Sequence, residues 1–161
     1  MAPNLAILSI PAYWLLSLAP HSYALTIASG GSISKFDNRN PRSSTYIDAL
    51  RKRLSPSDFA RYERAEAAHR NGFENLPLYA AAVFAGLLAD GVGKGGLVTG
   101  NATGESLRKF IYSFFAVRAT YNLVYIATAD NKKTWIRSAL YFLGVGLCIG
   151  EFVRAAKVLG D

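Results

Sequence analysis

The stretch RAEAAHRNGFENLPLY, from Arg64 to Tyr79, joins a polar half of the chain to an apolar half. From its last charged residue, Glu74, onward, residues 75–89 carry no charge at all. This pattern predicts a helix that starts in water and continues as a membrane span over roughly residues 68–89. Four polar side chains lie on its first two turns: His69, Arg70, Asn71 and Glu74.

The N-terminal segment is the longest uncharged run of the chain. Residues 2–34 contain no Lys, Arg, Asp or Glu, and about 20 apolar residues are enough to span a bilayer. We interpret residues 4–29 as the first membrane span. A cleaved signal peptide is the alternative, but it has a basic start and an apolar core of about 7 to 15 residues. This run has no basic residue and is much longer.

Two more apolar segments, residues 107–129 and 135–158, predict the third and fourth spans. The chain of 161 residues is therefore expected to form one all-α domain, an integral membrane four-helix bundle. The alternative is a soluble four-helix bundle, but a helix in a small soluble bundle needs a polar face, and the first helix is apolar on all sides.

The connections between the spans differ in character. Residues 30–67 form a polar loop, with a short amphipathic surface helix in YIDALRKRLS and a helix start at Ser55–Asp58. Residues 90–104 form a Gly-rich connector, and residues 130–133 a tight polar turn.

Basic residues are distributed unevenly over these loops. Residues 30–68 contain eight Lys and Arg, and residues 90–109 contain three. Because cytosolic loops are rich in Lys and Arg, the first loop is predicted to be cytosolic and both termini lumenal. The glycosylation sequon at Asn101 falls in a loop that this topology places in the lumen. The net charge of +7 thus marks membrane topology, and we expect no nucleic-acid partner.

Some residues of the apolar segments have a simple structural explanation. Cys148 is the only cysteine, so an intrachain disulfide is excluded, and we expect it to pack in the interior. Gly146 and Gly150 have the GxxxG spacing that permits close helix approach. No metal site is predicted.

The third and fourth spans also carry polar stripes. The polar residues of the third span follow i, i+3, i+4 and i+7 spacing, which places them on one face of the helix. The polar residues of the fourth span cluster at its start. Three stripes, one from each of the last three spans, are therefore predicted to meet at the cytosolic side. Arginines offer fixed forks for carboxylates, so the cavity suits a small anion. The stripes of the third and fourth spans are Arg118, Tyr121, Asn122 and Tyr125, then Arg137, Ser138 and Tyr141.

Arg118 is the most informative of these residues. An Arg deep in a membrane helix costs about 2.5 to 3.5 kcal/mol on insertion scales, so we expect it to face the interior and to find a partner there. Glu74 is the natural candidate. A helix–helix salt bridge with no other role explains these two residues equally well.

The segment AHRNGFENLPLY resembles the motif of the MAPEG family, the membrane-associated proteins of eicosanoid and glutathione metabolism. In that motif a His or Gln, an Asn two residues on and a Glu three further on open the second helix. The likeness continues as Arg118-x-x-Tyr121-x-x-x-Tyr125 and Arg137-Ser138-x-x-Tyr141, and it covers most of the chain. It implies a microsomal glutathione transferase-like homotrimer of the endoplasmic reticulum, which binds glutathione between neighbouring subunits.

The resemblance also implies roles for single residues. Arg137, helped by Ser138, is expected to face the glutathione thiol as the catalytic group. His69, Lys35 and Arg39 are further candidates for contacts with glutathione. Ala67 stands where family members usually carry an Arg, and the turn after Tyr125 is longer than in the prostaglandin and leukotriene synthases. The residues expected to bind glutathione are Arg70, Asn71, Glu74, Arg118, Tyr121, Tyr125 and Tyr141.

The function implied is a membrane-bound transferase or peroxidase that activates the thiolate of glutathione against a lipophilic electrophile from the bilayer. Isomerase activity is a variant of the same chemistry. The alternative is a non-catalytic lipid-binding or accessory membrane protein of the same fold. A scaffold that organises other membrane enzymes is a third hypothesis.

Overall fold

The computed structural model describes residues 3–32, 34, 39–92 and 103–160. Four of its helices are long and apolar enough to cross a membrane, and the described residues contain no strand. The prediction of an all-α membrane bundle with four long helices is confirmed. The elements in chain order are α1 (Leu5–Ala28), α2 (Ser44–Arg53), α3 (Pro56–Val92), α4 (Glu105–Ala127), η2 (Asn131–Lys133) and α5 (Thr134–Leu159).

The helix starts follow ordinary capping chemistry. The Asn4 side chain accepts the backbone N–H of Ala6 at 2.9 Å, which satisfies an orphan donor of the first turn of α1. Before α3, Ser55 Oγ accepts the backbone N–H of Asp58 at 3.1 Å. Pro56 then occupies the first helical position, where its missing N–H costs nothing.

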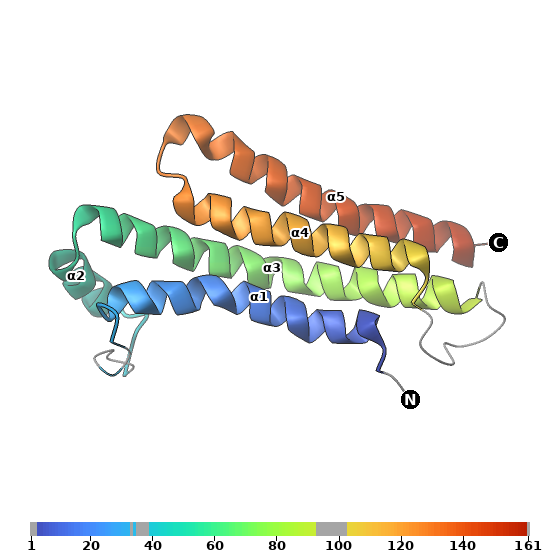
Figure 1. Cartoon of the computed structure of the whole chain (residues 1–161), viewed down its shortest axis with the longest axis horizontal. Coiled ribbons are helices and arrows are strands. Elements are labelled where there is room, and N and C mark those ends of the chain that lie inside the picture. The colour runs from blue at the N-terminus through green and yellow to red at the C-terminus, as the bar shows by residue number, and fades with distance from the viewer. Residues whose placement is uncertain (1–2, 33, 35–38, 93–102, 161) are drawn as a thin grey trace.

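The four long helices lie side by side (Figure 1). Helix α3 packs against each of the other three, α4 packs against both α1 and α5, and α2 rests on α3 at one end of the bundle. Both chain termini lie at the other end (Figure 1), as an even number of membrane crossings requires.

Helix α3 is much longer than a membrane span. Its 37 residues extend about 55 Å at 1.5 Å per residue, whereas the hydrocarbon core of a bilayer is about 30 Å thick. The charged residues of its first turns, including Asp58, Arg61 and Glu63, therefore lie outside the hydrocarbon core.

Aromatic rings dominate the core where α1, α3 and α4 meet. Tyr79 stacks on Phe114 with 4.3 Å between ring centroids, and its hydroxyl donates to Ser9 Oγ at 2.6 Å. Tyr13 donates to the backbone oxygen of Gly72 at 3.1 Å. Both buried phenols thus have partners, as an apolar interior requires. Cys148 is buried in the same cluster.

A buried ion cluster joins α3, α4 and α5 near the chain termini. Arg154 Nη1 lies 3.1 Å from Asp90 Oδ1, and Arg154 Nη2 lies 2.6 Å from Glu151 Oε1. Asp90 also accepts the backbone N–H of Gly104 at 2.7 Å. One guanidinium therefore pairs with two carboxylates, and the cluster ties the ends of three helices together.

Glycine permits close helix approach at Gly72 but not at the GxxxG pair. A Cβ on Gly72 would lie 2.7 Å from Ser17 Cβ and 3.2 Å from Ser17 Cα, so α1 and α3 meet there without room for a methyl group. A Cβ on Gly146 or Gly150 would meet nothing within 4 Å. Among the described residues of the chain, the GxxxG pair therefore makes no close helix contact.

The substitution Gly72→Ala is expected to destabilise the protein by about 2 kcal/mol, because the added methyl group forces α1 away from α3. Gly146→Ala is the matched control, and it should leave stability unchanged or raise it by up to about 1 kcal/mol, the usual gain of Ala over Gly in a helix. Thermal unfolding in detergent, followed by circular dichroism, measures both. Equal melting temperatures for the two variants would contradict the close contact.

Candidate functional site

The polar residues of α3 and α4 meet at the level of Asn71. Its side-chain nitrogen donates to the hydroxyl of Tyr121 at 2.6 Å, and its backbone oxygen accepts Arg118 Nη2 at 3.0 Å. Asn75 donates to the same backbone oxygen at 2.9 Å. Residues about 50 positions apart in the sequence are therefore fixed against one another by hydrogen bonds.

Arg118 is buried in this contact with its hydrogen-bonding capacity mostly unused. Only 1% of its surface is exposed, and its guanidinium lies over the ring of Tyr121, 4.4 Å from the centroid. Its Nε and Nη1 atoms have no hydrogen-bond partner among the described residues. A buried guanidinium is costly unless it is paired, so these two nitrogens are suited to an anionic ligand.

The expected pairing of Arg118 with Glu74 is wrong. The structure shows no ion pair between these two described residues, and Glu74 is exposed on α3. Arg118 Nη2 instead donates to the backbone oxygen of Asn71, one turn before Glu74 on α3, and the Glu74 side chain stays at the surface. The prediction that Arg118 faces the interior is correct.

The contacts of Arg118 continue to the start of α5. The ring centroid of Tyr141 lies 6.0 Å from the Arg118 guanidinium carbon and 6.2 Å from the ring centroid of Tyr121. The ring centroid of Tyr121 in turn lies 5.4 Å from that of Tyr125. The guanidinium carbon of Arg137 lies over the Tyr125 ring, 4.4 Å from its centroid. We call this set the polar network: Asn71, Arg118, Tyr121, Tyr125, Arg137 and Tyr141.

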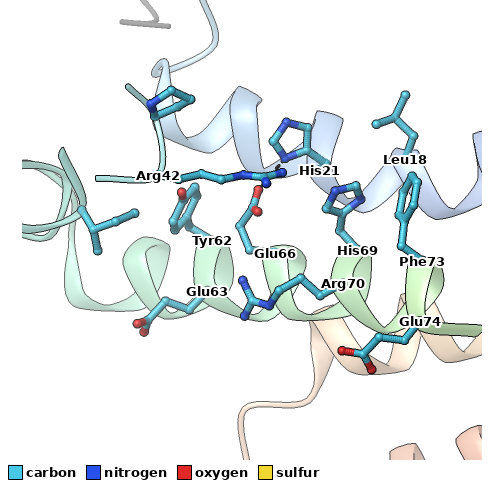
Figure 2. Close-up of a pocket in the computed structure, with 12 residues that line it drawn as sticks. Leu18, His21, Arg42, Tyr62, Glu63, Glu66, His69, Arg70, Phe73 and Glu74 are labelled. Carbon is cyan, nitrogen blue, oxygen red and sulfur yellow. Dashed lines mark hydrogen bonds and ion pairs between the residues drawn. The ribbon is translucent and has the colours of Figure 1, made fainter. Parts of the chain in front are cut away.

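A cavity of about 990 Å³ lies on the other side of α3, between α1, α3 and the segment before α2. We call it the α1–α3 pocket. Figure 2 shows Arg42 reaching over it, while Arg70 and Glu74 lie on the side of α3 that faces away from α1. Three predicted site residues line this cavity: His69, Arg70 and Glu74.

The pocket also holds a pair that sequence reasoning missed. His21 Nδ1 lies 2.6 Å from Glu66 Oε1, and the ring of His21 stacks on that of His69 with 4.9 Å between centroids. His69 donates its Nδ1–H to the backbone oxygen of Ser17 at 2.9 Å, so it joins α3 to α1. Apart from the tyrosines, His21 is the one titratable side chain of the first span. Its isolation in an apolar segment is the feature of the sequence from which a polar partner could have been predicted.

Of the remaining candidates, two are exposed and two lie outside the described residues. Ser138 is exposed on α5, one residue after Arg137. Arg39 is exposed in the segment before α2. Lys35 and the sequon residue Asn101 lie outside the described residues.

The predicted glutathione residues thus form two groups in one protomer. Asn71 belongs to the polar network between α3, α4 and α5, whereas Arg70 and Glu74 lie at the edge of the α1–α3 pocket, on the side of α3 that faces away from α1 (Figure 2). Arg70 and Glu74 are exposed, so they are available to a ligand or to a second copy of the chain.

Four helices long and apolar enough to cross a membrane, with a buried arginine that is incompletely paired among the described residues, define an integral membrane protein. The model of the MAPEG family matches residues 5–157, nearly the whole chain. The chain belongs to this family, whose members are membrane proteins of glutathione and eicosanoid metabolism and use glutathione as a substrate or cofactor. No curated protein and no solved structure matches the chain.

Proposed function

We propose that this protein is a membrane-bound glutathione-dependent transferase or peroxidase that attacks lipophilic electrophiles. The observation that carries the proposal is Arg118, a buried guanidinium with two unpaired nitrogens among tyrosine rings. Glutathione carries two carboxylates, and each unpaired guanidinium N–H can donate a charge-assisted hydrogen bond to a carboxylate oxygen. Family membership supplies the ligand class.

In this proposal the polar network binds the peptide and Arg137 faces its thiol. A free thiol has a pKa near 8.5, and the thiolate is the nucleophile. Lowering that pKa to about 6.5 requires about 2.7 kcal/mol of preferential stabilisation of the thiolate. The guanidinium of Arg137 supplies it by charge and hydrogen bonding, and the hydroxyl of Ser138 donates a second hydrogen bond.

The reaction then needs no cysteine of the protein. In conjugation the thiolate sulfur forms a bond to an electrophilic carbon, and the leaving group departs with its electron pair. In peroxide reduction two glutathione molecules are oxidised to the disulfide, while the hydroperoxide is reduced to an alcohol and water. Cys148, which is buried in the core, takes no part.

A homotrimer is part of the proposal, because the two groups of predicted residues lie on different sides of α3 in one protomer. Below Arg70 and Glu74, the same face of α3 exposes Pro77, Ala81 and Phe84, at spacings of three to four residues. A second copy packed on this stripe would bring its own polar residues to Arg70 and Glu74. We further propose an endoplasmic reticulum location, with the first loop cytosolic and the termini lumenal.

The substitution Arg137→Ala is expected to lower the rate of glutathione conjugation about 100-fold, the usual effect of removing one group that stabilises a developing anion. The measurement is the initial rate with a chromogenic aryl halide, using purified protein at saturating glutathione. Lys133→Ala, which removes an exposed charge four residues earlier, should leave the rate unchanged. Equal rates for wild type and Arg137→Ala would exclude the thiolate role.

The alternative, a non-catalytic lipid-binding or accessory protein of the same fold, makes a different prediction for the wild-type protein. It expects no heat of binding at millimolar glutathione in detergent. Ala67, where relatives usually carry an Arg, would then be the first residue to substitute, since Ala67→Arg should restore binding if the missing charge is the cause.

A further inference from the structure

A second cavity, of about 900 Å³, lies between α1, α3 and α4. Each of the three helices contributes residues at i, i+3, i+4 and i+7, which is one helical face. The stripe of α1 begins at Leu16 and that of α4 at Ala119, while α3 supplies Ser57, Ala60, Arg61 and Arg64. We call this cavity the α1–α4 groove. None of its lining residues belongs to the predicted glutathione set.

The groove is apolar along its walls and basic at one end. Its α1 and α4 walls are mostly Leu, Ile, Ala and Pro, and no Asp or Glu lines it. Asn122, a polar residue between the walls, donates to the backbone oxygen of Leu16 at 3.3 Å, so one of its two amide N–H donors is already used. The charge that remains is that of two arginines on α3.

Arg64 is held in position by the protein itself. Its Nε donates to the backbone oxygen of Ile126 at 2.9 Å, which fixes the side chain at the end of α4. Within the described parts of the chain, no acidic side chain forms an ion pair with it. Arg61 lies 3.7 Å from Asp58, but both side chains are about half exposed, so this pair is weak and screened.

The length of α3 puts the two arginines at the depth expected for a lipid head group. Arg61 and Arg64 belong to the first turns of α3, which extend beyond the hydrocarbon core, whereas the walls at Leu16 and Ala119 belong to the spans. Basic pockets between membrane helices bind anionic head groups. The size of the groove is that of a cleft for one small ligand or one acyl chain.

We propose that the α1–α4 groove is a binding site for an anionic phospholipid, whose phosphate contacts Arg61 and Arg64 and one of whose acyl chains lies between α1 and α4. A phospholipid suits the groove because its phosphate already resides at the depth of these arginines. The groove shares no lining residue with the proposed glutathione site, so the test of one proposal does not depend on the other.

Native mass spectrometry of the delipidated full-length protein tests the proposal. Phosphatidylserine and phosphatidylcholine with the same acyl chains are added in equal amounts. The wild-type protein is expected to retain phosphatidylserine with about a tenfold preference. The double variant Arg61→Gln, Arg64→Gln should lose this preference. The control Arg51→Gln, Lys52→Gln removes the same charge from exposed positions of α2 and should keep it.

A second variant keeps both charges and closes the groove. Ala119→Trp fills the wall of α4, so it should lower retention of phosphatidylserine severalfold even though Arg61 and Arg64 remain. The proposal is overturned if the double arginine variant keeps the wild-type preference, or if Ala119→Trp retains phosphatidylserine as wild type does. It is also overturned if equimolar oleate displaces phosphatidylserine completely, since the occupant is then a fatty acid.

Discussion

Substituting Arg118 by Met is expected to weaken glutathione binding about 1,000-fold and to leave the ligand-free protein as stable as before, or more stable. Truncating one partner of a buried charge pair costs about 2 to 5 kcal/mol of binding free energy. Without glutathione, by contrast, two nitrogens of Arg118 have no hydrogen-bond partner in the described part of the chain, and replacing such a buried charge by an apolar side chain is often neutral or favourable. The expected signature is therefore lost affinity with retained stability.

Isothermal titration calorimetry with glutathione measures the affinity, and thermal unfolding with and without glutathione measures the stability. The control is Arg108→Met, which removes an exposed arginine from the same helix and should change neither quantity. If Arg118→Met unfolds at a clearly lower temperature without ligand and binds glutathione normally, Arg118 is a structural residue. The unpaired nitrogens of Arg118 would then no longer support the proposed function.

Substituting Arg154 by Met is expected to destabilise the protein by about 3 to 5 kcal/mol. The change leaves Asp90 and Glu151 as two buried carboxylates without their shared cation, and breaking a buried ion cluster from one side costs about that much. The ends of α3, α4 and α5 should separate first, because Asp90 also holds the backbone of Gly104. Thermal unfolding and native-state hydrogen exchange at the end of α5 measure the effect.

Two further variants separate the loss of charge pairing from the loss of side-chain bulk. Lys157→Met removes an exposed cation from the same helix and should leave the melting temperature unchanged. Combining Asp90→Asn, Glu151→Gln and Arg154→Met neutralises the whole cluster and should recover much of the lost stability. A triple variant as unstable as Arg154→Met alone would show that packing, not charge, explains the effect.

The local sequence predicts the helices well and their contacts poorly. Hydropathy and length are properties of consecutive residues, so the four long apolar helices could be predicted directly. The GxxxG pair shows the limit, because Gly146 and Gly150 have the spacing of a contact site but meet nothing in the protomer. The close contact instead lies at Gly72, whose sequence neighbourhood gives no such indication.

The candidate site shows the same division. Spacing placed Arg118, Tyr121 and Tyr125 on one face of a helix, and their mutual contacts agree. It did not indicate that Asn71, rather than Glu74, faces Arg118. Nor did it pair His21 with Glu66, which lie 45 residues apart.

The sequence by itself determined the class of this protein: an all-α membrane bundle with polar residues at the mouths of its helices, in a pattern typical of the MAPEG family. Only the tertiary structure decided which polar groups meet, where glycine is needed, and that Arg118 is buried with two free nitrogens. The physical reason is that hydropathy and helical period act along one helix. Contacts between helices depend on the rotation and axial shift of each one, which are set by packing against all its neighbours.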